Sequence, residues 1–160
     1  MMRNYKFLLA LIGILTLLVI PSPSSAQMKS RAVINQEQAA ARQPLYTEYK
    51  GVRLGMTATE VRSKLGEPTY SDKELDLLTL SPTETAQIAY DSTGRVKVIS
   101  VDYQNGAGAP GPLGVVGVAL ETRDDGPLYK QVRYDTLKFW VSYSRTAGPA
   151  YIVTVTIQKM

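Results

Sequence analysis

The second half of the chain alternates between apolar and polar residues with the period of two that is typical of β-strands. Residues 85–91 and 95–103 both show it, and the turn-forming Ser92-Thr93-Gly94 between them predicts a hairpin. The same pattern in residues 128–134, 137–144 and 151–158 predicts a closing antiparallel meander. In residues 151–158 one side is apolar and the other mostly polar, which indicates a sheet covered on one side only.

A different pattern occupies residues 57–68, where the signals for a helix start and a helix stop lie close together. Thr57 and Glu60 have the spacing of a capping box, and Gly66 followed by Pro68 predicts that the helix ends there in left-handed geometry. The helix would be about two turns long, too short to be stable alone. We expect it to dock through Met56, Val61 and Leu65.

Helix first and strands after predict an α+β fold, with a short N-terminal helix packed on one face of an antiparallel β-sheet. A second helix is an open alternative. Residues 75–80 form a short apolar run, and Ser71 and Glu74 before it also have capping-box spacing, so the run could be a strand or a helical turn.

The first 26 residues have the features of a secretory signal peptide. Arg3 and Lys6 precede the uncharged apolar run 7–20, and Ser24 and Ala26 suit the −3 and −1 positions of a cleavage site. An uncleaved anchor is the alternative, but the run is shorter than the roughly 20 residues that span a bilayer. We predict an exported protein, periplasmic or extracellular, with a flexible linker or arm at 27–45 and a single domain at 46–160.

The charge and the cysteine content of the chain limit the kinds of partner and anchor that we expect. The formal charge is +4, and cleavage would remove Arg3 and Lys6 and leave +2. Basic residues are scattered singly, which argues against nucleic-acid binding. The absence of cysteine excludes a bacterial lipoprotein anchor and a Cys-based structural zinc site. Association with the outer membrane would therefore be peripheral.

Candidate chemistry is weak, and we predict no enzyme activity, no cofactor and no metal site. The chain has no His and no Cys, so a Ser or Thr nucleophile lacks its usual base. Residues 106–111 match GxGxxG, but two prolines interrupt the loop and β-branched residues follow it, so we interpret it as a surface loop. Asp124 and Asp125 are better explained as part of a turn before Gly126 than as metal ligands.

Trp140 is the candidate partner-binding residue. If the alternate residues Phe139, Val141 and Tyr143 face the core, Trp140 lies on the polar side of its strand. Tryptophan is enriched in binding hot spots, which favours a binding surface there. The alternative is that Trp140 packs under the N-terminal arm, the helix or the Gly/Pro-rich loop.

The segment from Gly51 to Tyr103 resembles the SmpA/OmlA family of BamE-like domains. The resemblance is carried by the turn Gly55-Met56-Thr57, a short helix with Val61, the Leu65-Gly66 pair with Pro68, and the hairpin 87–100. It implies an α+β sandwich similar to the β-lactamase-inhibitor-protein fold, an envelope location and a protein partner. We therefore predict a non-catalytic envelope protein that binds another protein, resembling outer-membrane assembly factors. The alternative is a soluble secreted inhibitor or ligand-binding domain of similar fold.

Overall fold

The computed structural model describes residues 43–120 and 126–160, all of which lie in the second of the two units into which the chain divides, Gln38–Met160. Strands make up 47% of the described residues and helices 12%. The strands are β1 (Glu48–Tyr49), β2 (Val52–Arg53), β3 (Tyr70–Ser71), β4 (Leu75–Ser81), β5 (Glu84–Tyr90), β6 (Val96–Gln104), β7 (Leu128–Tyr134), β8 (Phe139–Arg145) and β9 (Ile152–Lys159). The described helices are α2 (Ala58–Leu65) and α3 (Pro112–Val116).

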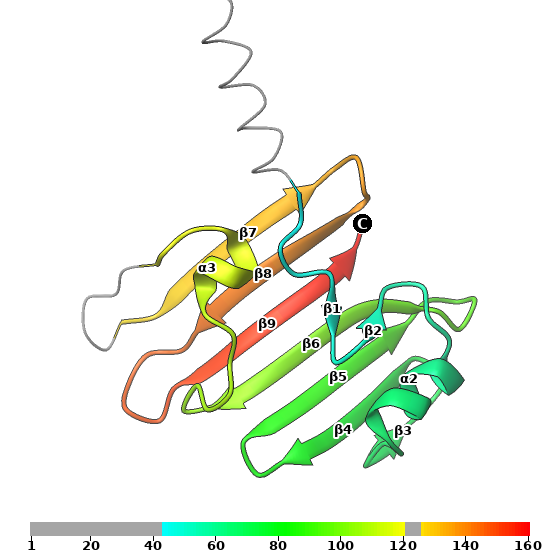
Figure 1. Cartoon of the computed structure of the whole chain (residues 1–160). Coiled ribbons are helices and arrows are strands. Elements are labelled where there is room, and N and C mark those ends of the chain that lie inside the picture. The colour runs from blue at the N-terminus through cyan, green and yellow to red at the C-terminus, as the bar shows by residue number, and fades with distance from the viewer. Residues whose placement is uncertain (1–42, 121–125) are drawn as a thin grey trace, which may run out of the picture. The chain divides into compact units, whose positions relative to one another are not determined.

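Seven of the strands form one antiparallel sheet in the order β3-β4-β5-β6-β9-β8-β7 (Figure 1). It consists of two meanders, β3 to β6 and β7 to β9, which meet where β9 pairs with β6. The connection from β6 to β7 carries α3 across one face of the sheet (Figure 1). The hairpin predicted at residues 85–103 and the closing meander are both confirmed.

One face of the sheet is covered by α2, α3 and the small β1–β2 hairpin, all on the near side in Figure 1. Val61 of α2, Val115 of α3 and Val52 of β2 are fully buried against it. A row of apolar side chains crosses the five strands from β5 to β7 beneath them: Ile88, Ile99, Ile157, Val141 and Val132. This covered face holds the single hydrophobic core of the described residues.

The helix signals at residues 57–66 are confirmed in their local geometry. Thr57 is the N-cap, its side chain accepts the Glu60 N–H, and the Glu60 carboxylate accepts the Thr57 N–H at 2.8 Å. Val61 is buried, and Met56 and Leu65 pack partly buried against the core. Gly66 ends the helix with φ 86° and ψ −175°, so its positive φ is as predicted but its ψ is extended rather than left-handed helical. That conformation is essentially restricted to glycine.

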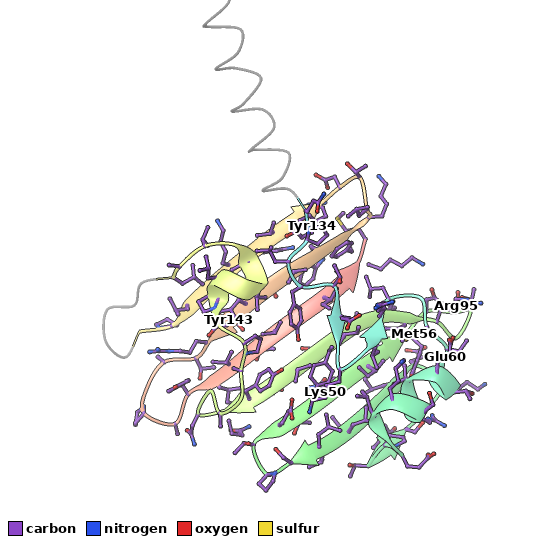
Figure 2. The ribbon with its side chains drawn as sticks, viewed as in Figure 1. Lys50, Met56, Glu60, Arg95, Tyr134 and Tyr143 are labelled. Carbon is purple, nitrogen blue, oxygen red and sulfur yellow. The ribbon has the colours of Figure 1, made fainter. Side chains whose placement is uncertain are left out.

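The turn before α2 is joined to the start of β6. The Gly55 N–H donates to the Val96 carbonyl and the Val96 N–H donates to the Met56 carbonyl, both at 2.8 Å. Arg95 also donates from its guanidinium to the Gly55 carbonyl. Figure 2 shows Met56, Glu60 and Arg95 close together at this junction. The two sequence features that carry the family resemblance therefore contact each other.

The predicted α+β class is wrong, because the described residues are mostly β and contain only two short helices, of eight and five residues, with no clear N-terminal helical layer. Two causes are visible. Residues 75–80 form strand β4 instead of a helical turn, because they pair with β5. The covered face is also filled partly by a hairpin and a loop.

The segments that precede α2 are described only in part. The signal peptide at 1–26 and nearly all of the arm at 27–45 lie outside the described residues. At the start of the predicted domain, residues 48–53 form the β1–β2 hairpin with positive φ at both Lys50 and Gly51. That pair of angles is typical of a type I′ hairpin turn.

Candidate binding face

The sheet has a second face, on which none of the described elements packs; we call it the outer face. Its side chains alternate along each strand with the buried ones, and the strand register aligns them into rows. The middle row spans all seven strands and consists of Tyr70, Leu77, Gln87, Ser100, Thr156, Ser142 and Gln131. The outer face is thus mostly uncharged and polar, as the alternation in residues 151–158 predicts.

Hydroxyl groups connect the central strands across the outer face. Ser100 and Thr156 on β6 and β9 share a hydrogen bond of 3.0 Å, and Thr154 donates to the Asp102 carboxylate at 2.7 Å. Ser142 on β8 is 6% exposed although it is on this face. These two hydrogen bonds join β6 to β9 on the outer face.

Trp140 lies on the outer face of β8, in the row between Arg133 of β7 and Gln158 of β9. Its neighbours along the strand, Phe139 and Val141, are buried on the covered face. Trp140 is therefore on the opposite side of the sheet from α2, α3 and the Gly/Pro-rich loop, which removes two of the three coverings considered from sequence. It is partly buried by its own sheet. The N-terminal arm lies almost wholly outside the described residues.

The strands around Trp140 form the basic half of the domain. Residues 126–160 contain five basic residues and one acidic residue, a net charge of +4. Residues 43–120 contain seven basic and nine acidic residues, a net charge of −2, and residues 121–125 contain one basic and three acidic residues. This separation is not visible in the whole-chain charge, and it only becomes spatial because β7, β8 and β9 lie together at one end of the sheet. Such a field favours acidic partners at that end.

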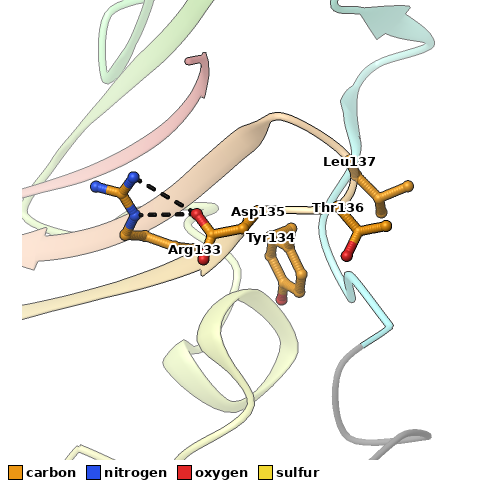
Figure 3. A pocket seen from close by; sticks show the side chains of 5 residues that line it. All are labelled: Arg133, Tyr134, Asp135, Thr136 and Leu137. Carbon is orange, nitrogen blue, oxygen red and sulfur yellow. Dashed lines mark hydrogen bonds and ion pairs between the residues drawn. The ribbon is translucent and has the colours of Figure 1, made fainter.

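A hollow of about 400 Å³ lies beside the β7–β8 turn, lined by Arg133, Tyr134, Asp135, Thr136 and Leu137 (Figure 3). Arg133 and Asp135 form an exposed ion pair of 3.5 Å across it. Leu137, the first residue of the strand predicted at 137–144, is 56% exposed because β8 begins only at Phe139. In the described part of the chain, the lining comes from this one segment at the end of β7 and the turn that follows it.

Buried ionisable groups elsewhere are in their ordinary charge states. Burial would raise the pKa of Asp76, but hydrogen bonds from Arg62, Ser71 and Tyr90 outweigh it and lower that pKa. Burial also raises the pKa of Tyr90. A carboxylate held more acidic beside a tyrosine held less acidic is a structural pair, because a general acid or base needs a pKa near the working pH.

A second such group joins the β1–β2 hairpin to β5. Glu84 accepts hydrogen bonds of 2.7 Å from the Tyr49 hydroxyl and from the Lys50 ammonium. Burial would raise the pKa of Glu84, but these two donors lower it, while burial raises the pKa of Tyr49. This cluster anchors the hairpin and places no titrating group near neutral pH.

The remaining candidates from sequence do not form a site among the described residues. The GxGxxG loop is followed by a helix, contrary to expectation, but α3 has only five residues and begins at Pro112. Its preceding strand belongs to an antiparallel sheet, so the parallel strand–helix–strand unit of a dinucleotide site is missing there. Asp124 and Asp125 lie outside the described residues. No cluster of potential metal ligands occurs in residues 43–120 and 126–160.

Comparison with family models, curated proteins and solved structures found no significant match to the chain. The SmpA/OmlA resemblance therefore stays a prediction. Among the helices in the described part of the chain, none combines the length and apolarity needed to cross a membrane. The sequence pattern singled out Trp140 but not Arg133, its partner in the register of β7 and β8. The signal that could have found Arg133 is the concentration of positive charge in residues 126–160.

Proposed function

We propose that this protein is a non-catalytic, exported cell-envelope protein that binds an acidic protein partner through the outer face around Trp140. The observation that carries the proposal is the position of Trp140, on a sheet face that no described element covers and beside Arg133 in the basic half of the domain. Tryptophan and arginine are the side chains most enriched in binding hot spots.

The character of the outer face favours a protein over a small ligand. Four of its central side chains are joined in two hydrogen-bonded pairs, and the described lining of the hollow near Arg133 comes from a single segment. A broad, polar face with aromatic residues near its rim has the composition of a non-obligate protein interface. The excess of positive charge at that end selects an acidic partner and speeds its approach.

Export rests on the sequence. The positive n-region, the 14-residue apolar run and the small residues before position 27 together are typical of a signal peptide. N-terminal sequencing of the protein recovered from cell fractions tests it directly. A start at Gln27 in the periplasmic or extracellular fraction is the expected result, and an intact Met1 in the cytoplasmic fraction would contradict export.

Binding is tested in two steps. The protein is immobilised, proteins from its own envelope extract are captured, and the captured protein is purified and its affinity measured directly. Trp140→Ala is expected to weaken that affinity about 30-fold, as for a hot-spot residue. Arg133→Glu is expected to weaken it as well, and its side chain is exposed enough that folding should be unaffected.

The matched control is Tyr70→Ala, which removes an exposed aromatic side chain from the same face at the far edge of the sheet. It is expected to leave the affinity unchanged. Equal losses for Tyr70→Ala and Trp140→Ala, or an unchanged affinity for Arg133→Glu, would overturn the proposed face. The identity of the captured protein separates an envelope-assembly role from the alternative of a secreted inhibitor, whose target would be an enzyme.

A further inference from the structure

The outer edge of β7 is the long free edge of the sheet. β7 is the last strand in the sheet order and pairs only with β8, over seven residues. The other edge strand, β3, has two residues, a length that itself discourages strand addition. Among residues 43–120 and 126–160 no strand pairs with the outer side of β7, and α3 lies over the covered face of β7 and β8 (Figure 1). Along this side of β7, a row of backbone N–H and C=O groups therefore has no strand partner in the described part of the chain.

The side chains of β7 add a charge pattern to this edge. Tyr129, Gln131 and Arg133 belong to the outer face, while Lys130 and Val132 alternate with them on the covered side. Lys130 and Arg133 are exposed and lie three residues apart, so they project from opposite faces of the strand. Arg133 is held only by the exposed pair with Asp135, which an incoming carboxylate can replace at little cost.

We infer that β7 receives an extended acidic segment of the partner protein as an eighth strand of the sheet. This rests on the proposed function, because it gives the partner of the Trp140 face its chemistry and its geometry. Backbone hydrogen bonds to β7 would supply the affinity. Carboxylates three residues apart in the partner would lie opposite Lys130 and Arg133, one on each face of the extended sheet.

A second copy of the same chain fits this edge less well. Antiparallel pairing of two β7 strands would bring two Lys130 and two Arg133 side chains to one junction. It would also join two regions of net charge +4 each. Like charges opposed across strands destabilise pairing, and basic side chains on an edge strand are a common device against self-association. A strand with acidic side chains would instead place opposite charges across from Lys130 and Arg133, and it would join a basic region to an acidic one.

The experiment uses the protein as recovered from cells and a fluorescent, terminally blocked peptide of seven residues. The peptide consists of Thr and Val with glutamates at its second and fifth positions, and a matched peptide has lysines there. Fluorescence anisotropy is expected to show binding of the glutamate peptide and not of the lysine peptide. The double variant Lys130→Glu, Arg133→Glu reverses both charges of β7. It is expected to weaken the affinity for the glutamate peptide about tenfold and to allow the lysine peptide to bind.

Two controls separate strand addition from simple charge attraction. Lys64→Glu with Lys73→Glu makes the same change in net charge on α2 and the β3–β4 turn, and is expected to leave peptide binding unchanged. Two further glutamate peptides carry N-methyl groups on alternate backbone nitrogens, in the two possible phases. One phase blocks the hydrogen bonds to β7 and is expected to weaken binding about tenfold, and the other leaves them intact.

The inference is overturned if the glutamate peptide does not bind, if both N-methylated peptides bind as well as the parent, or if the Lys64 and Lys73 control loses binding equally. It is also overturned if analytical ultracentrifugation shows a dimer that the β7 charge reversal dissociates or strengthens. If the peptide experiments fail but Trp140→Ala still weakens the affinity for the purified partner, only the inference of strand addition is overturned. Loss of that Trp140 effect would remove the proposed function itself.

Discussion

At the scale of single residues, Asp76 shows most clearly how this fold tolerates a buried charge. It is fully buried, the only charged residue among the described ones to be so. Its carboxylate accepts two hydrogen bonds from Arg62, at 2.9 and 3.1 Å, and one of 2.8 Å from the Tyr90 hydroxyl. A buried carboxylate with this many donors remains charged, because the hydrogen bonds replace the water that it has lost. The group ties α2 to β4 and β5.

We predict that Asp76→Ala destabilises the protein by about 3 kcal/mol, since it leaves the Arg62 guanidinium without its partner. The value is at the low end for a broken buried pair because the Arg62 side chain is 33% exposed. Urea unfolding measures it, and Asp135→Ala is the control, with a change near zero for an exposed pair. If Asp76→Ala lowers the free energy of unfolding as little as Asp135→Ala does, the Asp76 contacts make no net contribution to stability.

The same residue predicts how stability depends on pH. The folded pKa of Asp76 is lower than its ordinary value of 3.8, which the unfolded chain keeps. The contribution of Asp76 to the free energy of unfolding is therefore complete at pH values above its ordinary pKa. It disappears as the pH falls toward the folded pKa. The unfolding free energy of the wild type should drop on acidification below pH 3.8 more steeply than that of Asp76→Asn.

At the scale of elements, local signals predicted well where the chain itself satisfies them. The capping box of α2 and the Asp91–Gly94 turn of the β5–β6 hairpin both use side chains within five residues of their backbone partners. Strand β4 could not be separated from a helical turn, because only its pairing with β5 decides between them. The proportion of helix was also misjudged, since filling of the covered face by a hairpin and a loop is a tertiary property with no local signal.

The end of α2 provides the element-scale prediction. Gly66 has φ 86° and ψ −175°, a region that residues with a Cβ avoid, although open space surrounds the position of a Cβ. Gly66→Ala should therefore cost about 1–3 kcal/mol through backbone strain alone. Gly114→Ala is the matched control within α3, where φ is negative and nothing lies near a Cβ. It should stabilise the protein by up to about 1 kcal/mol, because alanine has the higher helix propensity.

Thermal melts of the two glycine variants measure the difference, with far-UV circular dichroism as the probe. A Gly66→Ala protein as stable as the wild type would mean that the chain can leave α2 by another route. That route would have to keep the Gly66 N–H bonded to the Arg62 carbonyl, at 2.9 Å in this structure.

At the scale of the whole domain, the decisive contact is the pairing of β9 with β6. It joins two meanders that are each local in sequence, and it brings together residues more than fifty positions apart, such as Ile157 and Ile99. The charge separation and the position of Trp140 both depend on this closure, because it places β7, β8 and β9 together at one end. Sequence patterns predicted the β5–β6 hairpin and the β7–β9 meander but gave no indication of the strand at which the two halves of the sheet meet. Non-local pairing of this kind is also expected to make folding slow.

Closure through β9 predicts that the two meanders unfold together. Ile157 is 1% exposed and lies between Ile99 and Val141 in the central core row, so Ile157→Ala should cost about 2–5 kcal/mol. Trp140 fluorescence reports on the β7–β9 meander and far-UV circular dichroism on the whole sheet. The urea midpoints measured by the two probes should shift by the same amount, because one core cannot lose half its strands and remain stable. Separate transitions, with only the Trp140 signal shifted, would show that the meanders are independent units and that the closure of the sheet stabilises only one of them.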